Sequence, residues 1–239
     1  MEPFRFRKFA VAHDRCTHKV GTDGVLLGAW VRISVSDRNI LDVGTGCGVI
    51  ALMLAQRSEE NTRIDAIEIE EQDARQAADN AHASPWKDRV KVHHTSFQNF
   101  LPQKQYDLIV SNPPYFTNSF LSDDKNRSRA RHAHLLPYDD FLDHATRLMS
   151  NRARLAIILP PAESARMEEL ATTRGLSVIR TTQFRARKHK PVERILLELA
   201  FVGTIVQDDE LILYAEGNNW SDAYLKLTQD FYLAAGRDR

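Results

Sequence analysis

Short runs of aliphatic and β-branched residues alternate with helical patterns from about Asn39 onward. Such an alternation predicts a mostly parallel sheet with crossover helices on both faces, an α/β fold. The expected strands lie at residues 40–43, 63–69, 90–93, 107–111, 155–159, 176–179 and 195–201.

The segments between these strands have the period of helices that lie on a sheet. Apolar residues spaced i, i+3, i+4 and i+7 form one stripe on a helix. One stripe comprises Ala74, Ala77, Ala78 and Ala81, and a second comprises Phe141, Leu142, Ala145, Leu148 and Met149.

Strand patterns also separate the centre of the sheet from its edge. Residues 108–110 and 155–159 are continuous apolar runs, which suit burial on both faces, whereas Lys91 between Val90 and Val92 suits an edge strand. No helix pattern separates the last two strands, so a hairpin connects them and the final strand is reversed. The resulting architecture is a seven-stranded, mostly parallel sheet.

Two flanking segments complete one expected domain, 1–239. Residues 1–38 form an N-terminal cap with an amphipathic helix candidate at 22–31, residues 39–201 form the α/β core, and residues 202–239 form an extension with a helix from Ser221. Both flanks are too short to fold alone, so we expect them to pack on the core.

Composition narrows the class of protein. The chain has 239 residues, 43% hydrophobic and 27% charged, which is typical of a globular domain and excludes disordered and collagen-like classes. Because we find no apolar run near 18 residues, no secretory signal and only two cysteines, we expect a cytoplasmic protein outside the membrane. Lys+Arg and Asp+Glu are 32 each, so a polyanionic partner would need a local basic patch.

A glycine-rich turn follows the first strand. Residues 40–48 read Ile-Leu-Asp-Val-Gly-Thr-Gly-Cys-Gly, and Glu68 ends the second strand. The spacing G-x-G-x-G misses the dinucleotide fingerprint by one residue, whereas a strand-end acid can accept hydrogen bonds from ribose hydroxyls. Together they indicate an adenosine pocket without a pyrophosphate site. Taken alone, the glycines could form an ordinary turn between a strand and a helix, and Glu68 could be a solvated acid at a strand end.

The tetrapeptide Asn112-Pro113-Pro114-Tyr115 follows the fourth strand. Ligands of open α/β sheets bind at the carboxyl ends of strands, so this loop and the glycine turn should share one crevice. Two prolines stiffen the loop and leave carbonyl and amide oxygens as acceptors beside an aromatic ring. Such a loop suits an NH2 group, although a rigid turn would also explain the prolines.

These motifs resemble those of class I S-adenosylmethionine-dependent methyltransferases that act on planar amino nitrogens. More narrowly, residues 19–30 and 112–116 resemble the bacterial tRNA1(Val) (adenine(37)-N6)-methyltransferase family, and the similarity extends through Phe231. His18 departs from the apolar residue expected before Lys19. The resemblance implies a Rossmann-like fold, S-adenosyl-L-methionine as cofactor and tRNA as substrate.

Roles for individual residues follow from this resemblance. Asn112 and the Pro113 carbonyl would accept hydrogen bonds from the adenine amino group, held rigid by Pro114, while Tyr115 stacks on the base. The cofactor would contact Lys19, Asp23, Asp42, Gly44, Gly46, Gly48, Glu68, Ser96, Phe97 and Asn112. Asp42 is more suited to ordering the glycine turn, and Phe97 could equally be a core aromatic.

Substrate contacts are expected from Phe116 and from two basic runs on the active-site side. The first contains Arg127, Arg129 and Arg131, and the second contains Arg185, Arg187 and Lys188. Either run could instead be a solvated surface. We expect a monomer without a metal ion.

Three other functions use part of this pattern. DNA amino methyltransferases usually need a larger recognition domain, and protein glutamine methyltransferases carry a helical domain before the glycine turn, for which 39 residues leave little room. A non-catalytic nucleotide-binding module would have no use for residues 112–115.

Overall fold

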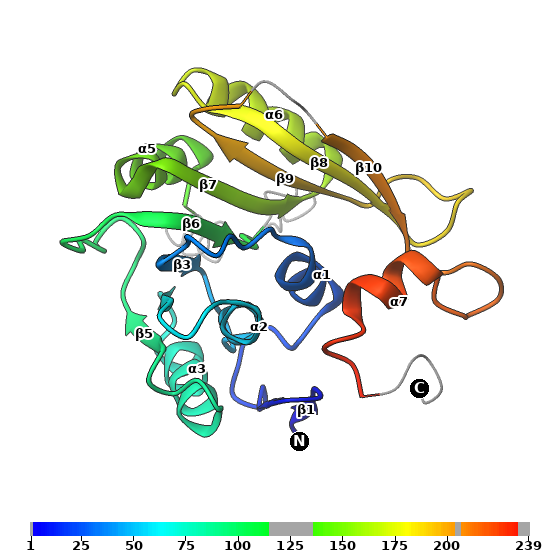
Figure 1. The fold of residues 1–239 in the computed structure, drawn as a ribbon, viewed down its shortest axis with the longest axis horizontal. Coiled ribbons are helices and arrows are strands. Elements are labelled where there is room, and N and C mark those ends of the chain that lie inside the picture. Colours follow the sequence, from blue (N-terminus) through cyan, green and yellow to red (C-terminus); the bar gives the residue numbers. More distant parts are fainter. Residues whose placement is uncertain (1, 115–135, 204–206, 234–239) are drawn as a thin grey trace, which may run out of the picture.

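The computed structural model describes residues 2–114, 136–203 and 207–233. Within them, eight strands form one twisted sheet in the order β10-β8-β9-β7-β6-β3-β4-β5 (Figure 1). Strand β9 is antiparallel to β7 and β8, and the other pairs are parallel. The strands are β3 (Asn39–Val43), β4 (Arg63–Glu68), β5 (Val90–His94), β6 (Tyr106–Ser111), β7 (Met149–Leu159), β8 (Ser177–Arg185), β9 (Arg194–Ala200) and β10 (Gln207–Ile212).

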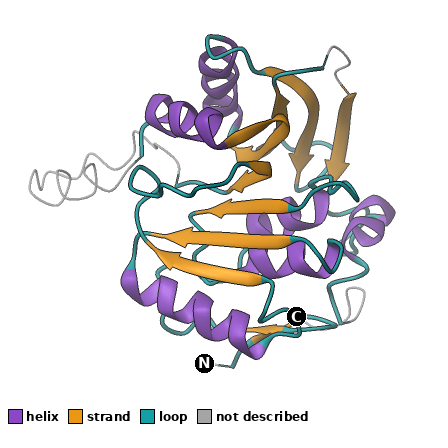
Figure 2. Ribbon diagram, turned by 60° about the vertical axis from the view of Figure 1, so that its left-hand side comes forward, coloured by secondary structure: helices purple, strands orange, loops and turns teal. Residues whose placement is uncertain are grey.

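Helices lie on either side of this sheet (Figure 2). They are α1 (Thr22–Trp30), α2 (Val49–Arg57), α3 (Glu71–Ala83), α5 (Tyr138–Leu148), α6 (Pro161–Thr172) and α7 (Asp222–Thr228). Alternate residues of each strand face opposite ways. Ile40 therefore joins the core under α1 and α2, while Leu41 joins the core under α5 and α6. A short hairpin, β1 (Phe4–Arg5) with β2 (Ala10–Val11), precedes the first helix.

The seven strands expected from the sequence are present, including the hairpin between β8 and β9 and the edge position of β5. The structure corrects their number by adding β10, which pairs with β8. The first four residues of β10, 207–210, are all exposed. Hence this edge strand lacks the apolar alternation by which the others were predicted.

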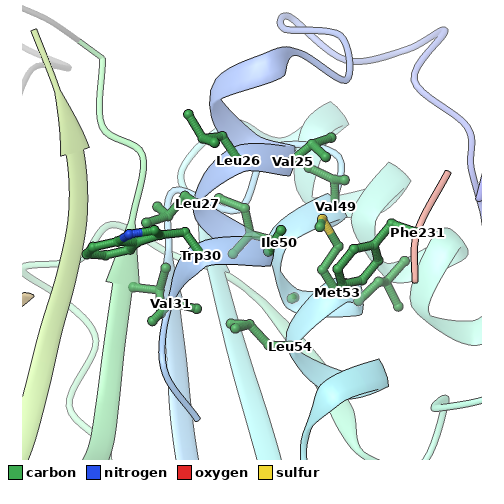
Figure 3. Close-up of a cluster of buried hydrophobic side chains, with 14 of the residues drawn as sticks. Val25, Leu26, Leu27, Trp30, Val31, Val49, Ile50, Met53, Leu54 and Phe231 are labelled. Atoms are coloured by element: carbon green, nitrogen blue, oxygen red, sulfur yellow. The ribbon is translucent and has the colours of Figure 1, made fainter. Parts of the chain in front are cut away.

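The expectation that residues 22–31 form an amphipathic helix was wrong in one respect. Helix α1 is present, but all residues from Gly24 to Trp30 are buried. A Cβ atom on Gly28 would lie 2.8 Å from Sδ of Met53, so α1 packs backbone-close against α2. Figure 3 shows the side chains of both helices that fill this contact, in one cluster with Phe231. Helix α1, which the sequence assigned to an N-terminal cap, is thus part of the core.

A buried carboxylate joins α1 to the sheet. Glu198 on β9 is 0% exposed, and its Oε1 accepts a hydrogen bond from the Arg32 backbone N–H at 3.0 Å. Three guanidinium groups, those of Arg32, Arg154 and Arg180, lie 4.0 Å from its carboxylate oxygens. Arg180 also stacks on the Trp30 ring, 4.1 Å from its centroid. This cluster fixes the carboxyl end of α1 against β7, β8 and β9.

The apolar stripe expected on α3 is only partly correct. Ala74, Ala77 and Ala81 are buried, but Ala78 is exposed. Three polar residues of α3 are buried instead: Asp73, Gln76 and Asn80. They are buried because residues 12–17 lie along this face and supply the hydrogen-bond partners that buried polar groups require.

Candidate functional site

The glycine turn leaves the carboxyl end of β3 in the centre of the sheet. Gly44, Gly46 and Gly48 all have positive φ, between 56° and 85°. At Gly48 a Cβ atom would also lie 3.4 Å from the backbone of Ala77, so only glycine fits there without strain. At Gly44 and Gly46, by contrast, a Cβ atom would meet nothing within 4 Å. The backbone of the turn is therefore open to a ligand on that side.

Glu68 at the end of β4 holds this turn in place. Its Oε2 accepts a hydrogen bond from the Gly46 N–H at 2.8 Å, and its Oε1 accepts from Ile69 and Glu70 at 2.8 and 3.0 Å. A carboxylate offers about four acceptor positions. The side chain is 8% exposed, so a remaining position can still receive a hydroxyl donor. This geometry fits the ribose role expected from the sequence.

Strand register places Asn112 beside the glycine turn. Val43 pairs with Ser111 in the parallel ladder between β3 and β6, so Gly44 and Asn112 leave adjacent strands at the same level. Neighbouring strands are about 4.8 Å apart. The Ser111 hydroxyl also donates to the Val43 carbonyl at 2.9 Å, which ties the two strand ends together. The two motifs thus leave neighbouring strands side by side at the same edge of the sheet.

Asp42 lies beneath the turn and is 0% exposed. Its Oδ2 accepts hydrogen bonds from Thr45 Oγ1 at 2.6 Å and from the Ala51 N–H at 3.1 Å, so it links the turn to the first residues of α2. Within the described residues, Oδ1 has no partner. Burial raises the pKa of Asp42 to about 7, partly offset by the bonds from Thr45 and Ala51. The buried carboxyl group thus holds the glycine turn against the start of α2.

The raised pKa of Asp42 makes stability depend on pH. The pKa of Asp42 is about 7 in the folded protein and 3.8 for an unperturbed aspartate, which stands for the unfolded chain. As pH rises, the folded protein therefore keeps this proton to a higher pH than the unfolded chain does. Protonated Asp42 therefore stabilises the folded state. This stabilisation is fully present below pH 4, and up to about 4 kcal/mol of it is lost as pH rises towards 7. Asp42→Asn removes this titration, so the variant should gain stability relative to wild type between pH 4.5 and 7.5 in urea unfolding. Asp140→Asn, at an exposed aspartate, is the control; a difference independent of pH at Asp42 would refute the assignment.

Asp23 lies in the first turn of α1. Its Oδ2 accepts a hydrogen bond from Nε of Arg194 at 2.8 Å. Arg194 begins β9, whose antiparallel direction puts its first residue at the carboxyl edge of the parallel strands. Sequence reasoning missed Arg194, because a charged residue at the start of a strand carries no distinguishing pattern. Lys19, three residues before α1, is exposed.

Ser96 and Phe97 follow β5 at the same edge but differ in exposure. Ser96 is partly exposed, and its hydroxyl accepts from the Asn99 N–H at 3.3 Å. Phe97 is 5% exposed, with its ring centroid 5.3 Å from that of Phe141 and 4.8 Å from that of His144. Phe97 is thus mainly a core aromatic, and its contact with adenine stays a prediction.

The second basic run lies at the carboxyl edge, in the β8–β9 connection. Arg185 forms an ion pair with Glu210 on β10, and Arg187 donates to the Gly217 carbonyl and to Asn218 Oδ1. These two arginines therefore support the C-terminal extension. The exposed cations of the run are Lys188 and Lys190, with His189 between them.

Several predicted site residues lie outside the described part of the chain: Tyr115, Phe116, Arg127, Arg129 and Arg131. Among the described residues, no cluster of three or more His, Cys, Asp or Glu side chains could hold a metal ion. In the same residues, no helix is long and apolar enough to cross a membrane.

Known proteins are similar to this chain in sequence and in fold. Residues 22–131 match the family model of the methyltransferase small domain. A tRNA1(Val) (adenine(37)-N6)-methyltransferase of Trichodesmium erythraeum is 42% identical, over 96% of this chain and 97% of the relative. A protein of the same name from Christiangramia forsetii is 38% identical, over 97% of this chain and 98% of the relative. The chain belongs to this family.

The family has an S-adenosylmethionine-dependent methyltransferase fold. A solved structure of a predicted O-methyltransferase from Agrobacterium tumefaciens superposes with a TM-score of 0.67 at 18% identity, covering 87% of this chain and 96% of that one. At this identity the likeness shows the fold alone. Family membership makes this protein an S-adenosylmethionine-dependent methyltransferase, and the open side of the glycine turn with Glu68 fits that cofactor.

Proposed function

We propose that this protein methylates N6 of adenosine 37, next to the anticodon, in valine tRNA, and that it acts in the cytoplasm. The observation that carries this proposal is the register of β3 and β6, by which Asn112 leaves the sheet beside the glycine turn. The names of its relatives supply the nucleotide and the tRNA.

The reaction requires a weak nucleophile to be aimed and its developing charge to be stabilised. The lone pair of an adenine amino group is delocalised into the ring, and bound S-adenosylmethionine supplies an electrophilic methyl group on its sulfonium. The side-chain oxygen of Asn112 and the carbonyl of Pro113 accept the two amino N–H bonds, which holds the nitrogen in line and favours its positive charge. The proton lost after transfer passes to solvent, so no side-chain base is needed.

Cofactor contacts come from both sides of the crevice. The backbone of the glycine turn and the Glu68 carboxylate would hold the nucleoside part of the cofactor, and Lys19 and Asp23 would hold its amino-acid part. We expect Tyr115, which lies outside the described residues, to stack on the base, because bases of single-stranded loops can be splayed out.

The test is labelled methyl transfer to three acceptors in parallel: total tRNA from a strain that lacks this enzyme, a release factor, and duplex DNA. Label in tRNA, recovered as N6-methyladenosine at position 37, supports the proposal. Label in the release factor at a glutamine would replace it with protein methylation, and label in DNA would replace it with DNA methylation.

The exposed lysines of the β8–β9 connection should contact the tRNA backbone. This connection lies at the carboxyl edge of the parallel strands, two to three strand spacings of about 4.8 Å from β6. Lys188→Glu with Lys190→Glu should weaken tRNA binding about tenfold or more and reduce its dependence on log salt by about 1.5–2. S-adenosylmethionine affinity should not change. Filter binding at two salt concentrations measures the first effect and calorimetry the second.

The matched control reverses two exposed lysines near the amino edge of the sheet, Lys87→Glu and Lys91→Glu. An equal loss of tRNA binding in both double variants would mean that the protein's overall charge, not this connection, attracts the RNA.

A further inference from the structure

The N-terminal segment, residues 12–20, reaches the site by way of α3. The Thr17 N–H donates to both carboxylate oxygens of Asp73, at 3.0 and 3.2 Å. Arg15 donates to Gln76 at 2.9 Å and pairs with Asp79 at 2.5 Å. The segment then continues directly into Lys19 and α1, where the sequence places two of the expected cofactor residues, Lys19 and Asp23.

Asn80 on α3 joins this segment to the glycine turn. Its side-chain nitrogen donates to the carbonyls of Ala12 and Cys47, both at 2.8 Å, and its Oδ1 accepts from the Ala12 N–H at 2.9 Å. The residue is 5% exposed. Three hydrogen bonds satisfy its amide on both sides, so one buried side chain sets the position of two segments that lie 35 residues apart in sequence.

Other contacts show that the two segments meet at this face of α3. Gly48 approaches the backbone of Ala77, one turn before Asn80. The side chains of Cys16 and Cys47 are neighbours: Cys47 raises the pKa of the Cys16 thiol, and Cys16 lowers the pKa of the Cys47 thiol. The N-terminal segment and the glycine turn therefore pack against each other as well as against α3.

We propose that Asn80 is a positioning residue for S-adenosylmethionine. It does not touch the reacting atoms; through Cys47 it fixes the glycine turn, and through Ala12 it fixes the segment that carries Lys19. Without its amide, the two walls of the crevice shift independently, and binding must first restore their spacing. The proposal rests on the methyltransferase activity but not on the identity of the methyl acceptor.

Two variants test the role of this amide. Asn80→Asp keeps the volume but faces both carbonyls with a carboxylate oxygen, and Asn80→Ala removes all three hydrogen bonds. Because buried polar groups that lose their hydrogen-bond partners destabilise the binding-competent arrangement, we expect the Kd for S-adenosylmethionine to rise about tenfold, at a stoichiometry of one per chain. At saturating S-adenosylmethionine, kcat should stay within about threefold of wild type, because the acceptors at residues 112 and 113 are untouched.

The matched control is Asp79→Ala, which removes an exposed ion pair between α3 and the same segment but has no contact with the glycine turn. Its Kd should equal that of wild type. A Kd rise below threefold in both Asn80 variants overturns the proposal. So does failure of both variants to fold, judged by circular dichroism, because Asn80 would then serve stability alone. Calorimetry needs no methyl acceptor, so a wrong choice of tRNA would leave this result unaffected.

Discussion

The Asn112→Ala variant should turn over roughly 10²–10³-fold more slowly than wild type at saturating S-adenosylmethionine and tRNA, with an unchanged fold. Asn112 follows β6 beside Gly44, and in the proposed mechanism its side-chain oxygen accepts one amino hydrogen of the base. Removing one preorganised acceptor from the transition state lowers kcat and kcat/KM together. Single-turnover methyl transfer measures the effect on chemistry without product release.

A second substitution separates the acceptor from the rest of the amide. Asn112→Asp keeps an oxygen in place, so its loss should be much smaller than that of Asn112→Ala. Asn99→Ala, at an exposed asparagine on the same edge of the sheet, serves as the control and should be fully active. Activity of Asn112→Ala within a few-fold of wild type would remove Asn112 from the mechanism.

The Glu198→Ala variant should lose about 3–5 kcal/mol of unfolding free energy. Glu198 is 0% exposed, and its removal leaves Arg32, Arg154 and Arg180 close together without their shared anion. Burial already lowers the pKa of Arg180, which shows the cost of charge at this place. Urea unfolding followed by circular dichroism measures the loss.

An exposed pair provides the comparison for Glu198. Glu210, on the neighbouring strand β10, bonds to Arg185 at 2.5 Å and its side chain is 45% exposed. Glu210→Ala should cost at most about 1 kcal/mol, because solvent screens this pair. If the two variants lost equal stability, the buried cluster would have no special role in holding α1.

The comparison of sequence and structure is clearest at the strands. Runs such as 108–110 and 155–159 are buried on both faces, and continuous apolar sequence was enough to predict them. Strand β10 was missed because an exposed edge strand has no apolar face to reveal it. Helix α1 was given a polar face because small residues such as Gly24 and Gly28 carry no sign of what packs on them.

The candidate site also contains residues that the sequence predicted and residues that only the structure revealed. The sequence predicted the glycine turn, Glu68 and Asn112 as site residues because each lies at the end of a strand and has a distinctive chemistry, and the structure brings them to one edge of the sheet. Arg194 and Asn80 were not predicted, because their roles depend on partners distant in sequence: Asp23 for one, Ala12 and Cys47 for the other. Phe97 could not be assigned between core and cofactor until its neighbours were known.

The sequence by itself determined the α/β class, the order of the strands along the chain and the motifs of the methyltransferase family, because periodicity and glycine spacing are local properties. The tertiary structure decided which strand ends are neighbours, that the N-terminal segment belongs to the core, and how α3 joins that segment to the glycine turn. These features depend on hydrogen bonds and packing between residues far apart in sequence. No local pattern in one amino-acid sequence indicates which distant residues will meet.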